Sequence, residues 1–182
     1  MTLESIKIGD NPMKLKRIVL GLVAFLAALT LVACGSKEAN TDTDPTKTAD
    51  FQLLKAGQMD VRNHYEYKDD KVLKMTTTTT LLYSTIQVDS ADAAKQYMET
   101  KGVEKWDGIK GITHKVDYKN DRLVETTTVD FSKVDINANA DLLQLQVPSG
   151  KRVDHISYKQ SIKTLKNQGY TQVMDGKFKE LN

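Results

Sequence analysis

The chain has 182 residues, enough for one domain of ordinary size with a short extension. Its 26 basic and 24 acidic residues leave a net charge of +2, which excludes the strongly basic surface of a typical nucleic-acid-binding domain. Its single cysteine, Cys34, excludes an internal disulfide and a multi-cysteine zinc site.

The first feature along the chain is an apolar run from Ile18 to Ala33, preceded by three basic residues. Its sixteen residues are short for a membrane span, which needs about 20. Basic, apolar and small residues in this order predict a secretory signal in residues 1–33. We expect translation to begin at Met13, because the preceding twelve residues contain acidic side chains and do not resemble a signal start.

The apolar run ends in Leu31-Val32-Ala33-Cys34, which resembles the lipobox of bacterial lipoproteins. The resemblance implies cleavage between Ala33 and Cys34 and a diacylglyceryl group on the Cys34 sulfur. Two acyl chains give stable anchoring, whereas one gives only marginal membrane binding. The prediction is a protein anchored by lipid to the extracytoplasmic face of the cell membrane. The alternative is a plain buried cysteine at the end of a hydrophobic helix.

A polar segment follows the cysteine. Residues 35–49 contain no large apolar side chain, so we expect residues 34–49 to be a flexible tether and residues 50–182 to be the folded domain. Removal of residues 1–33 leaves 22 basic and 22 acidic residues, so the mature chain has no net charge. Such a chain has no field that attracts nucleic acid or anionic lipid.

Two hairpins are predicted in the folded part. Residues 59–67 alternate as a half-buried strand does, and residues 72–88 predict a long second strand. Residues 112–118 and 123–131 predict another pair. The turn segment of the first hairpin, residues 67–73, matches residues 118–124 at an offset of 51, and threonines follow both turns. The match indicates a duplication. The threonines of residues 76–80 either tile a solvated sheet face or form an array that binds ice or glycan.

Helices are predicted after both hairpins. The first is capped by Asp89 or Ser90 and ends at Gly102; the second has Ser157 and Gln160 as a capping box and ends at Gly169. Residues 132–156 form a longer connection of unassigned structure, and residues 170–173 add a last strand. The predicted fold is α+β: one antiparallel sheet from two hairpin-plus-helix units, with both helices on one face.

Taken together, the lipobox, the segment Gly108-Ile109-Lys110-Gly111, the strand from Asp121 to Asp130, and Gly169-Tyr170 resemble the YehR-like lipoproteins of bacteria. The resemblance covers roughly residues 50–175. It implies an α+β domain in the cell envelope. It implies no activity, because the family has no assigned role, and no catalytic residue is carried over.

No nucleophile elbow, zinc motif or phosphate loop is present in the sequence. We predict no catalytic residues, no metal and no cofactor. The histidines His64, His114 and His155 lie on separate predicted elements; if the duplication holds, His64 and His114 could approach each other. The charged residues of 115–133 alternate in sign, which is typical of a solvated sheet face.

The only tryptophan, Trp106, lies in a glycine-flanked segment. It either closes one end of the core or contacts a ligand. The sequence favours a non-catalytic binding or interaction module whose partner is another envelope protein, a peptide or a glycan. The alternative is a membrane-anchored envelope enzyme, hydrolase-like, with an unrecognised site.

Overall fold

The structure is a computed structural model that describes residues 45–145, 147 and 151–182. Its strands are β1 Lys47–Lys55, β2 Met59–Lys68, β3 Lys71–Leu82, β4 Ile112–Tyr118, β5 Arg122–Asp130, β6 Ile156–Ser157 and β7 Thr171–Val173. Its helices are α2 Tyr83–Ile86, α3 Ala91–Thr100, the 3-10 helix η2 Val103–Trp106, and α4 Tyr158–Asn167. None of the helices in these residues is both long and apolar enough to cross a membrane.

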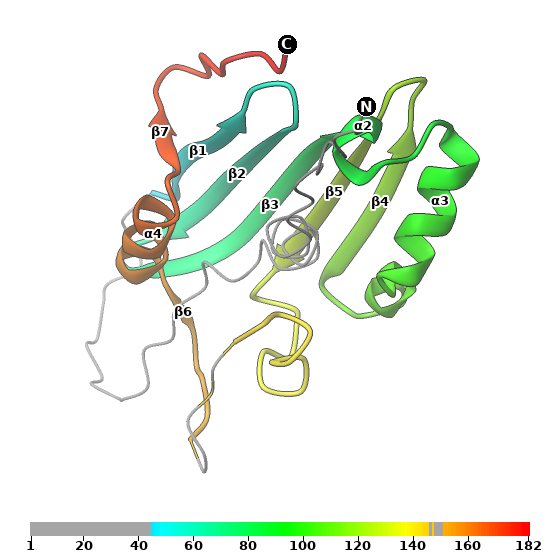
Figure 1. Ribbon diagram of the computed structural model, residues 1–182. Coiled ribbons are helices and arrows are strands. Elements are labelled where there is room, and N and C mark those ends of the chain that lie inside the picture. Colours follow the sequence, from blue (N-terminus) through cyan, green and yellow to red (C-terminus); the bar gives the residue numbers. More distant parts are fainter. Residues whose placement is uncertain (1–44, 146, 148–150) are drawn as a thin grey trace, which may run out of the picture.

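In the described residues the strands form a seven-stranded antiparallel sheet with the order β4-β5-β3-β2-β1-β7, and β6 pairs with β3 (Figure 1). The predicted hairpins are β2-β3 and β4-β5, which meet where β3 pairs with β5. The predicted α+β class is therefore confirmed.

The duplication is visible in the sheet, but with a change of offset. In the first hairpin Tyr67 pairs with Val72 while Glu66 pairs with Lys74, so Leu73 is an extra residue, a β-bulge. Beyond the bulge the equivalent positions of β3 and β5 are 50 residues apart rather than 51. This correction makes Thr77 and Thr127 equivalent, and these two residues are direct cross-strand partners. A local twofold axis perpendicular to the sheet passes between them.

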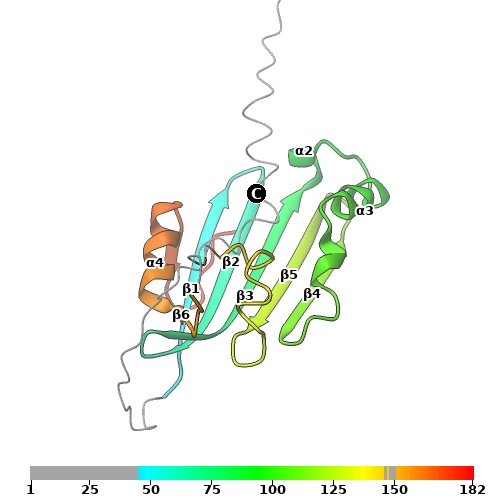
Figure 2. The ribbon, with the colours of Figure 1, turned by 90° about the horizontal axis from the view of Figure 1, so that it is seen from below.

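The two long helices, α3 and α4, lie on one face of the sheet, as predicted (Figures 1 and 2). Each helix covers the hairpin of the other hairpin-plus-helix unit. α3 follows β3 but contacts β4 and β5. α4 follows β5, and its first residue Tyr158 stacks on Tyr67 of β2 with ring centroids 3.5 Å apart. This exchange joins the two units into one core.

The predicted caps are present. Ser90 accepts a hydrogen bond from the Ala93 N–H at the start of α3, and Ser157 accepts one from the Gln160 N–H at the start of α4. Each cap satisfies a backbone donor that the first turn of a helix leaves free. Ser157 also donates to Asp70 in the first turn (2.9 Å), which ties α4 to the β2-β3 hairpin.

The boundary between tether and domain differs from the prediction. The sheet begins at Lys47, so residues 47–49 of the expected tether belong to β1, and Ala49 is buried. β1 itself was not predicted. Its central residues Phe51 and Gln52 are both buried, because each face of the strand is covered, and the alternation that marks a half-buried strand is weak there.

The predicted strand of residues 72–88 was too long, since β3 ends at Leu82. The chain then turns into α2, where Tyr83 is anchored to the second hairpin turn: its N–H donates to the Asp121 carbonyl (2.8 Å) and its hydroxyl to the Lys119 carbonyl (2.7 Å). Gln87, with φ 59°, ends this short helix. The apolar pattern continues past the end of the strand because Tyr83 and Ile86 of this short helix are buried in the core.

The longer connection follows β5 as a series of turns over residues 131–144 and lies between α3 and α4 on the helix face (Figure 2). Its Leu143 and Leu145 are buried in the core. The threonine run alternates: Thr77 and Thr79 are buried, while Thr76, Thr78 and Thr80 lie on the opposite, open face of the sheet. The interpretation of the run as a solvated face is therefore wrong for two of its five threonines.

Candidate functional site

Of the sequence-predicted site residues, Ala33 and Cys34 lie outside the described residues. Trp106 is the last residue of η2 and is 3% exposed. Gly102 ends α3 with φ 70°, and the following turn of 3-10 helix directs the indole into the core. The ring therefore offers almost no surface to a ligand in this structure, and Trp106 lies in the core.

The indole lies on a buried polar pair. Its ring stacks against His114, with centroids 6.3 Å apart and planes 24° apart. His114 Nε2–H donates to Glu125 Oε1 over 2.8 Å, and the two side chains are 6% and 9% exposed. Glu125 was expected on a solvated face. It lies instead on the helix face, because that face of β5 also carries the buried residues Leu123 and Val129.

The expected approach of His64 to His114 is wrong. His64 is on the open face and lies 2.8 Å from Asp50, whereas His114 is on the helix face of a strand three positions away in the sheet. The residue of the first unit equivalent to His114 is Asn63, one position before His64. A shift of one residue moves a side chain to the other face of a strand. Within the part of the chain that the structure describes, no group of three or more metal-ligating side chains is found.

Three of the alternating carboxylates do form exposed pairs with a neighbouring cation. A hydrogen bond from Lys115 lowers the pKa of Asp117, and one from Arg122 lowers the pKa of Asp121. Hydrogen bonds from Lys133 and Ser132 lower the pKa of Asp130. Pairs of this kind on a surface contribute little stability. They fit a solvated sheet edge rather than an acid–base site.

A tyrosine cluster fills the core under α4. Tyr65 is fully buried, its ring meets Phe51 and Tyr158 edge-on at 6.1 Å, and Tyr170 lies nearby with 3% exposure. Burial raises the pKa of the Tyr65 and Tyr170 hydroxyls well above 10, because the ionised form would lose its hydration. Both phenols stay protonated at physiological pH and act as packing groups.

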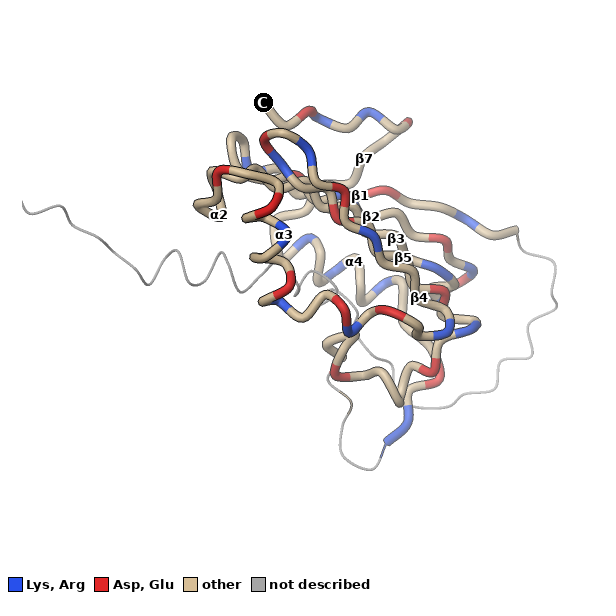
Figure 3. The backbone as a smooth tube through the Cα atoms, turned by 90° about the vertical axis from the view of Figure 1, so that its right-hand side faces the viewer, with Lys and Arg blue, Asp and Glu red and all other residues tan. Residues whose placement is uncertain are grey.

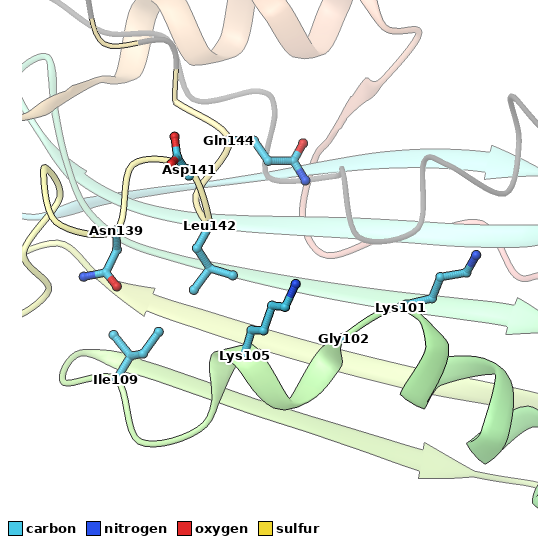
Figure 4. A pocket seen from close by; sticks show the side chains of 8 residues that line it. All are labelled: Lys101, Gly102, Lys105, Ile109, Asn139, Asp141, Leu142 and Gln144. Atoms are coloured by element: carbon cyan, nitrogen blue, oxygen red, sulfur yellow. The ribbon is translucent and has the colours of Figure 1, made fainter.

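A groove of about 470 Å³ opens on the helix side, between the segment that joins α3 to β4 and the turns that follow β5 (Figure 4). This volume is in the range of small-molecule sites. The lining residues are Lys101, Gly102, Lys105, Ile109, Asn139, Asp141, Leu142 and Gln144. We call this feature the lysine groove.

The charge of the lysine groove comes from two lysines and one carboxylate. Lys105 extends toward the turn that carries Leu142, and Lys101 lies farther along the same wall (Figure 4). Lys101 Nζ also lies 4.7 Å from the centroid of the Tyr97 ring. Neither lysine forms an ion pair with another described residue. Among the lining residues that the structure describes, Asp141 is the only acid, so these residues carry one excess positive charge beside the apolar side chains Ile109 and Leu142. This arrangement suits a ligand with an anionic group and an apolar part.

The sequence did not indicate the lysine groove. Its two walls lie about 35 residues apart in the chain, and the turns at 139–144 have no periodic pattern. The only local signal was Gly102, which ends α3 and turns the chain so that Lys101 and Lys105 lie on the same side. A helix stop was predicted there, but its consequence for the lysines depends on the fold.

The chain folds as a small α+β domain with a groove on its helix side. Comparison with protein families matches residues 47–171 to DUF1307, a protein family of unknown function. The chain belongs to this family.

Relatives support the lipoprotein nature of the chain. The uncharacterized lipoprotein Lin0239 of Listeria innocua is 34% identical over 161 residues, which cover 87% of this chain and 97% of that protein. The uncharacterized lipoprotein YehR of Escherichia coli is 26% identical over 152 residues, covering 84% and 93%. The family resemblance expected from the motifs is confirmed. The names of these relatives imply a membrane-anchored envelope protein and indicate no ligand.

The NMR structure of E. coli YehR shares the fold, with a TM-score of 0.57 and 22% identity over 72% of this chain and 93% of that one. At this identity the likeness shows the fold alone.

Proposed function

We propose that this protein is a lipoprotein held at the extracytoplasmic face of the cell membrane by acyl chains on Cys34, and that its domain is a non-catalytic binding module. The anchoring is supported by the coincidence of Leu31-Val32-Ala33-Cys34 with relatives named lipoproteins. The binding site is the lysine groove, and its ligand carries an anionic group.

A binding role fits the chemistry of the described residues better than catalysis does. His114 and Glu125 are a pair of groups capable of acid–base chemistry, but they lie in the core, where Trp106 stacks on His114 and shields the pair from solvent. The described residues that line the groove include lysines, amides and one carboxylate but no histidine or cysteine. Such groups recognise a ligand by charge and hydrogen bonding.

Anchoring is tested by the mass and the partitioning of the mature protein. We expect a mass with a diacylglyceryl group on an N-terminal cysteine and recovery in the membrane fraction after a high-salt wash. Cys34→Ala should abolish both, while the domain keeps its thermal stability. A membrane-bound Cys34→Ala protein, or a wild type with an unmodified thiol, would contradict the proposal.

Binding is tested on the soluble Cys34→Ala chain by calorimetric titration with short peptides and oligosaccharides, each in an acidic and a neutral form. We expect binding by acidic forms only, lost in Lys101→Glu/Lys105→Glu. The matched control Lys95→Glu/Lys163→Glu changes the net charge equally at exposed helix positions outside the groove. Equal binding by both double variants, or none by the parent chain, would exclude the groove as the site.

A further inference from the structure

The open face of the sheet carries a second arrangement, independent of the lysine groove and of the lipid anchor. The C-terminal tail, residues 174–182, turns back after β7 and runs over the side of the sheet away from α3 and α4 (Figure 3). Beneath it lie Gln52 of β1 and Asp60 of β2, which are only 4% and 3% exposed although they face outward.

The contact between sheet and tail is directed at the peptide backbone. Gln52 Nε2–H donates to the Lys179 carbonyl (2.7 Å), and Gln52 Oε1 accepts from the Lys179 N–H (3.0 Å). The side-chain amide thus pairs with both polar groups of one residue, as a neighbouring strand would. Farther along, the Gly57 N–H in the β1-β2 turn donates to the Asn182 carbonyl (3.0 Å). None of these bonds depends on a tail side chain.

A cation contacts the ring of the tail residue Phe178. The Arg62 guanidinium lies 4.6 Å from the centroid of the Phe178 ring, and its Nε–H donates to Asp60 Oδ2 (2.6 Å). The other Asp60 oxygen accepts from Gln52 Nε2–H (2.8 Å). Asp60 therefore holds both Gln52 and Arg62 in place from below, and the three form a preorganised site on adjacent strands.

The tail makes few buried contacts with the rest of the domain. Phe178 and Leu181 are half-buried, and the remaining residues from 174 to 182 are exposed. β7, which precedes the tail, pairs with β1 over three residues only. Few buried contacts and a short edge strand are features of segments that open locally. Moreover, Gln52, Asp60 and Arg62 lie within the residues that match the family, 47–171, whereas the tail lies beyond them.

We propose that Gln52, Asp60 and Arg62 form a recognition site for an extended peptide segment with an aromatic residue, and that the C-terminal tail is its tethered occupant. A partner protein binds by presenting such a segment in place of the tail. Backbone pairing through Gln52 gives affinity with little sequence demand, and the ring over Arg62 sets the register.

The tether determines how the test is built. A segment attached this close to its site has an effective concentration of the order of millimolar, so the wild-type tail masks the site from free peptide. The tail is therefore weakened within the full chain, with Phe178→Ala removing the ring and Lys179→Pro removing the N–H that Gln52 accepts. The probe is a fluorescein-labelled peptide of residues 172–182, followed by anisotropy on the soluble Cys34→Ala background.

We expect the peptide to bind the tail-weakened chain about tenfold or more tightly than the chain with its own tail. Adding Gln52→Ala or Arg62→Ala should remove most of this binding, whereas Thr126→Ala, on the same face two strands from Arg62, should not change it. Arg62 is 32% exposed but pairs with the buried Asp60 carboxylate, so circular dichroism first establishes that each variant is folded. Asp60→Asn/Arg62→Ala, which leaves no unpaired charge, tests the site where a single variant unfolds the domain.

Three outcomes would overturn the proposal: no peptide binding by the tail-weakened chain at 1 mM or below, equal binding with and without the native tail, or full binding by Arg62→Ala. Association of the wild type into dimers that the peptide dissolves would support the site and identify a second copy of this chain as the source of the segment. Monomeric wild type with peptide binding as expected supports a different protein as the partner.

Discussion

Replacing His114 by leucine would leave the Glu125 carboxylate in the core without its hydrogen-bond donor. The pair spans 2.8 Å, and its side chains are 6% and 9% exposed, so neither group is solvated. Removal of one partner of such a pair leaves a buried charge and costs about 3–5 kcal/mol. For a domain of this size that corresponds to a melting temperature lower by roughly 10–15 °C. Trp106 would also lose the ring on which it stacks.

Replacing Glu125 alone, and both residues together, separates the energy of the His114–Glu125 interaction from the effect of each side chain by itself. Glu125→Met leaves His114, which can be buried as a neutral ring, so we expect a smaller loss of about 1–3 kcal/mol. The double variant His114→Leu/Glu125→Met replaces both polar groups by apolar ones of similar volume and should return to within about 1–2 kcal/mol of the wild type. The four proteins form a double-mutant cycle with a large coupling energy.

Urea unfolding of the four soluble chains, followed by circular dichroism at pH 7, measures these free energies. Glu66→Gln serves as the control, because Glu66 and Lys74 form an exposed pair and its loss should have no measurable effect. If the double variant is as unstable as His114→Leu alone, the cost is lost packing rather than an unpaired charge, and the reasoning fails.

Three further predictions rest on single contacts. Gly111→Ala should destabilise by about 2 kcal/mol or more, because φ is 86° and the new Cβ would lie 2.6 Å from backbone; Gly108→Ala, with positive φ but open space, should cost clearly less in the same melting experiment. Ser157→Ala should lower stability by about 1–2 kcal/mol, measured by urea unfolding, since it removes both the α4 cap and the bond to the first hairpin turn. Burial raises the folded-state pKa of Tyr65 and Tyr170, so the stability that they contribute is complete below pH 10. It is lost as the pH rises above 10, at about 2.7 kcal/mol per pH unit for the two residues together. Tyrosinate absorbance that rises together with unfolding, and a shallower loss of stability in Tyr65→Phe/Tyr170→Phe, would verify this prediction.

Local chemistry made much of the fold predictable. The turns after Tyr67 and Tyr118, the caps Ser90 and Ser157, and the order of hairpin and helix were all legible, because each depends on a few adjacent residues. The strand β1 was missed for the opposite reason: both of its faces are covered, one by the helix-side core and the other by the C-terminal tail, whose contact residue Lys179 is 127 residues from Gln52. Neither cover can be inferred from residues 47–55.

The candidate sites were less predictable than the fold. Trp106 belongs to the core, and the features that form the two proposed sites come from distant segments: Lys101 and Lys105 meet turns that follow β5, while Gln52 meets the C-terminal tail. The sequence shows which charged and aromatic residues are capable of binding a ligand. Which of them share a surface is decided by long-range strand pairing, which the sequence pattern constrains only weakly.

The bulge at Leu73 shows how much one residue can change. Read at a constant offset of 51, the repeat aligns Thr76 with Thr127, but these residues face opposite sides of the sheet. With the bulge counted, Thr77 and Thr127 lie on the local axis, and Asn63 and His114 become equivalent beside them.

The corrected repeat explains a polar row through an apolar core. The row runs His114, Thr127, Thr77, Asn63 across four neighbouring strands, and its members are buried or nearly so. Buried polar side chains are costly unless they are hydrogen-bonded. The two halves differ in their hydrogen bonds: Asn63 Oδ1 accepts from Thr77 Oγ1–H within the row (2.7 Å), whereas His114 donates to Glu125 in the next row. The two halves thus carry a polar side chain at the equivalent position, and each side chain has a different partner.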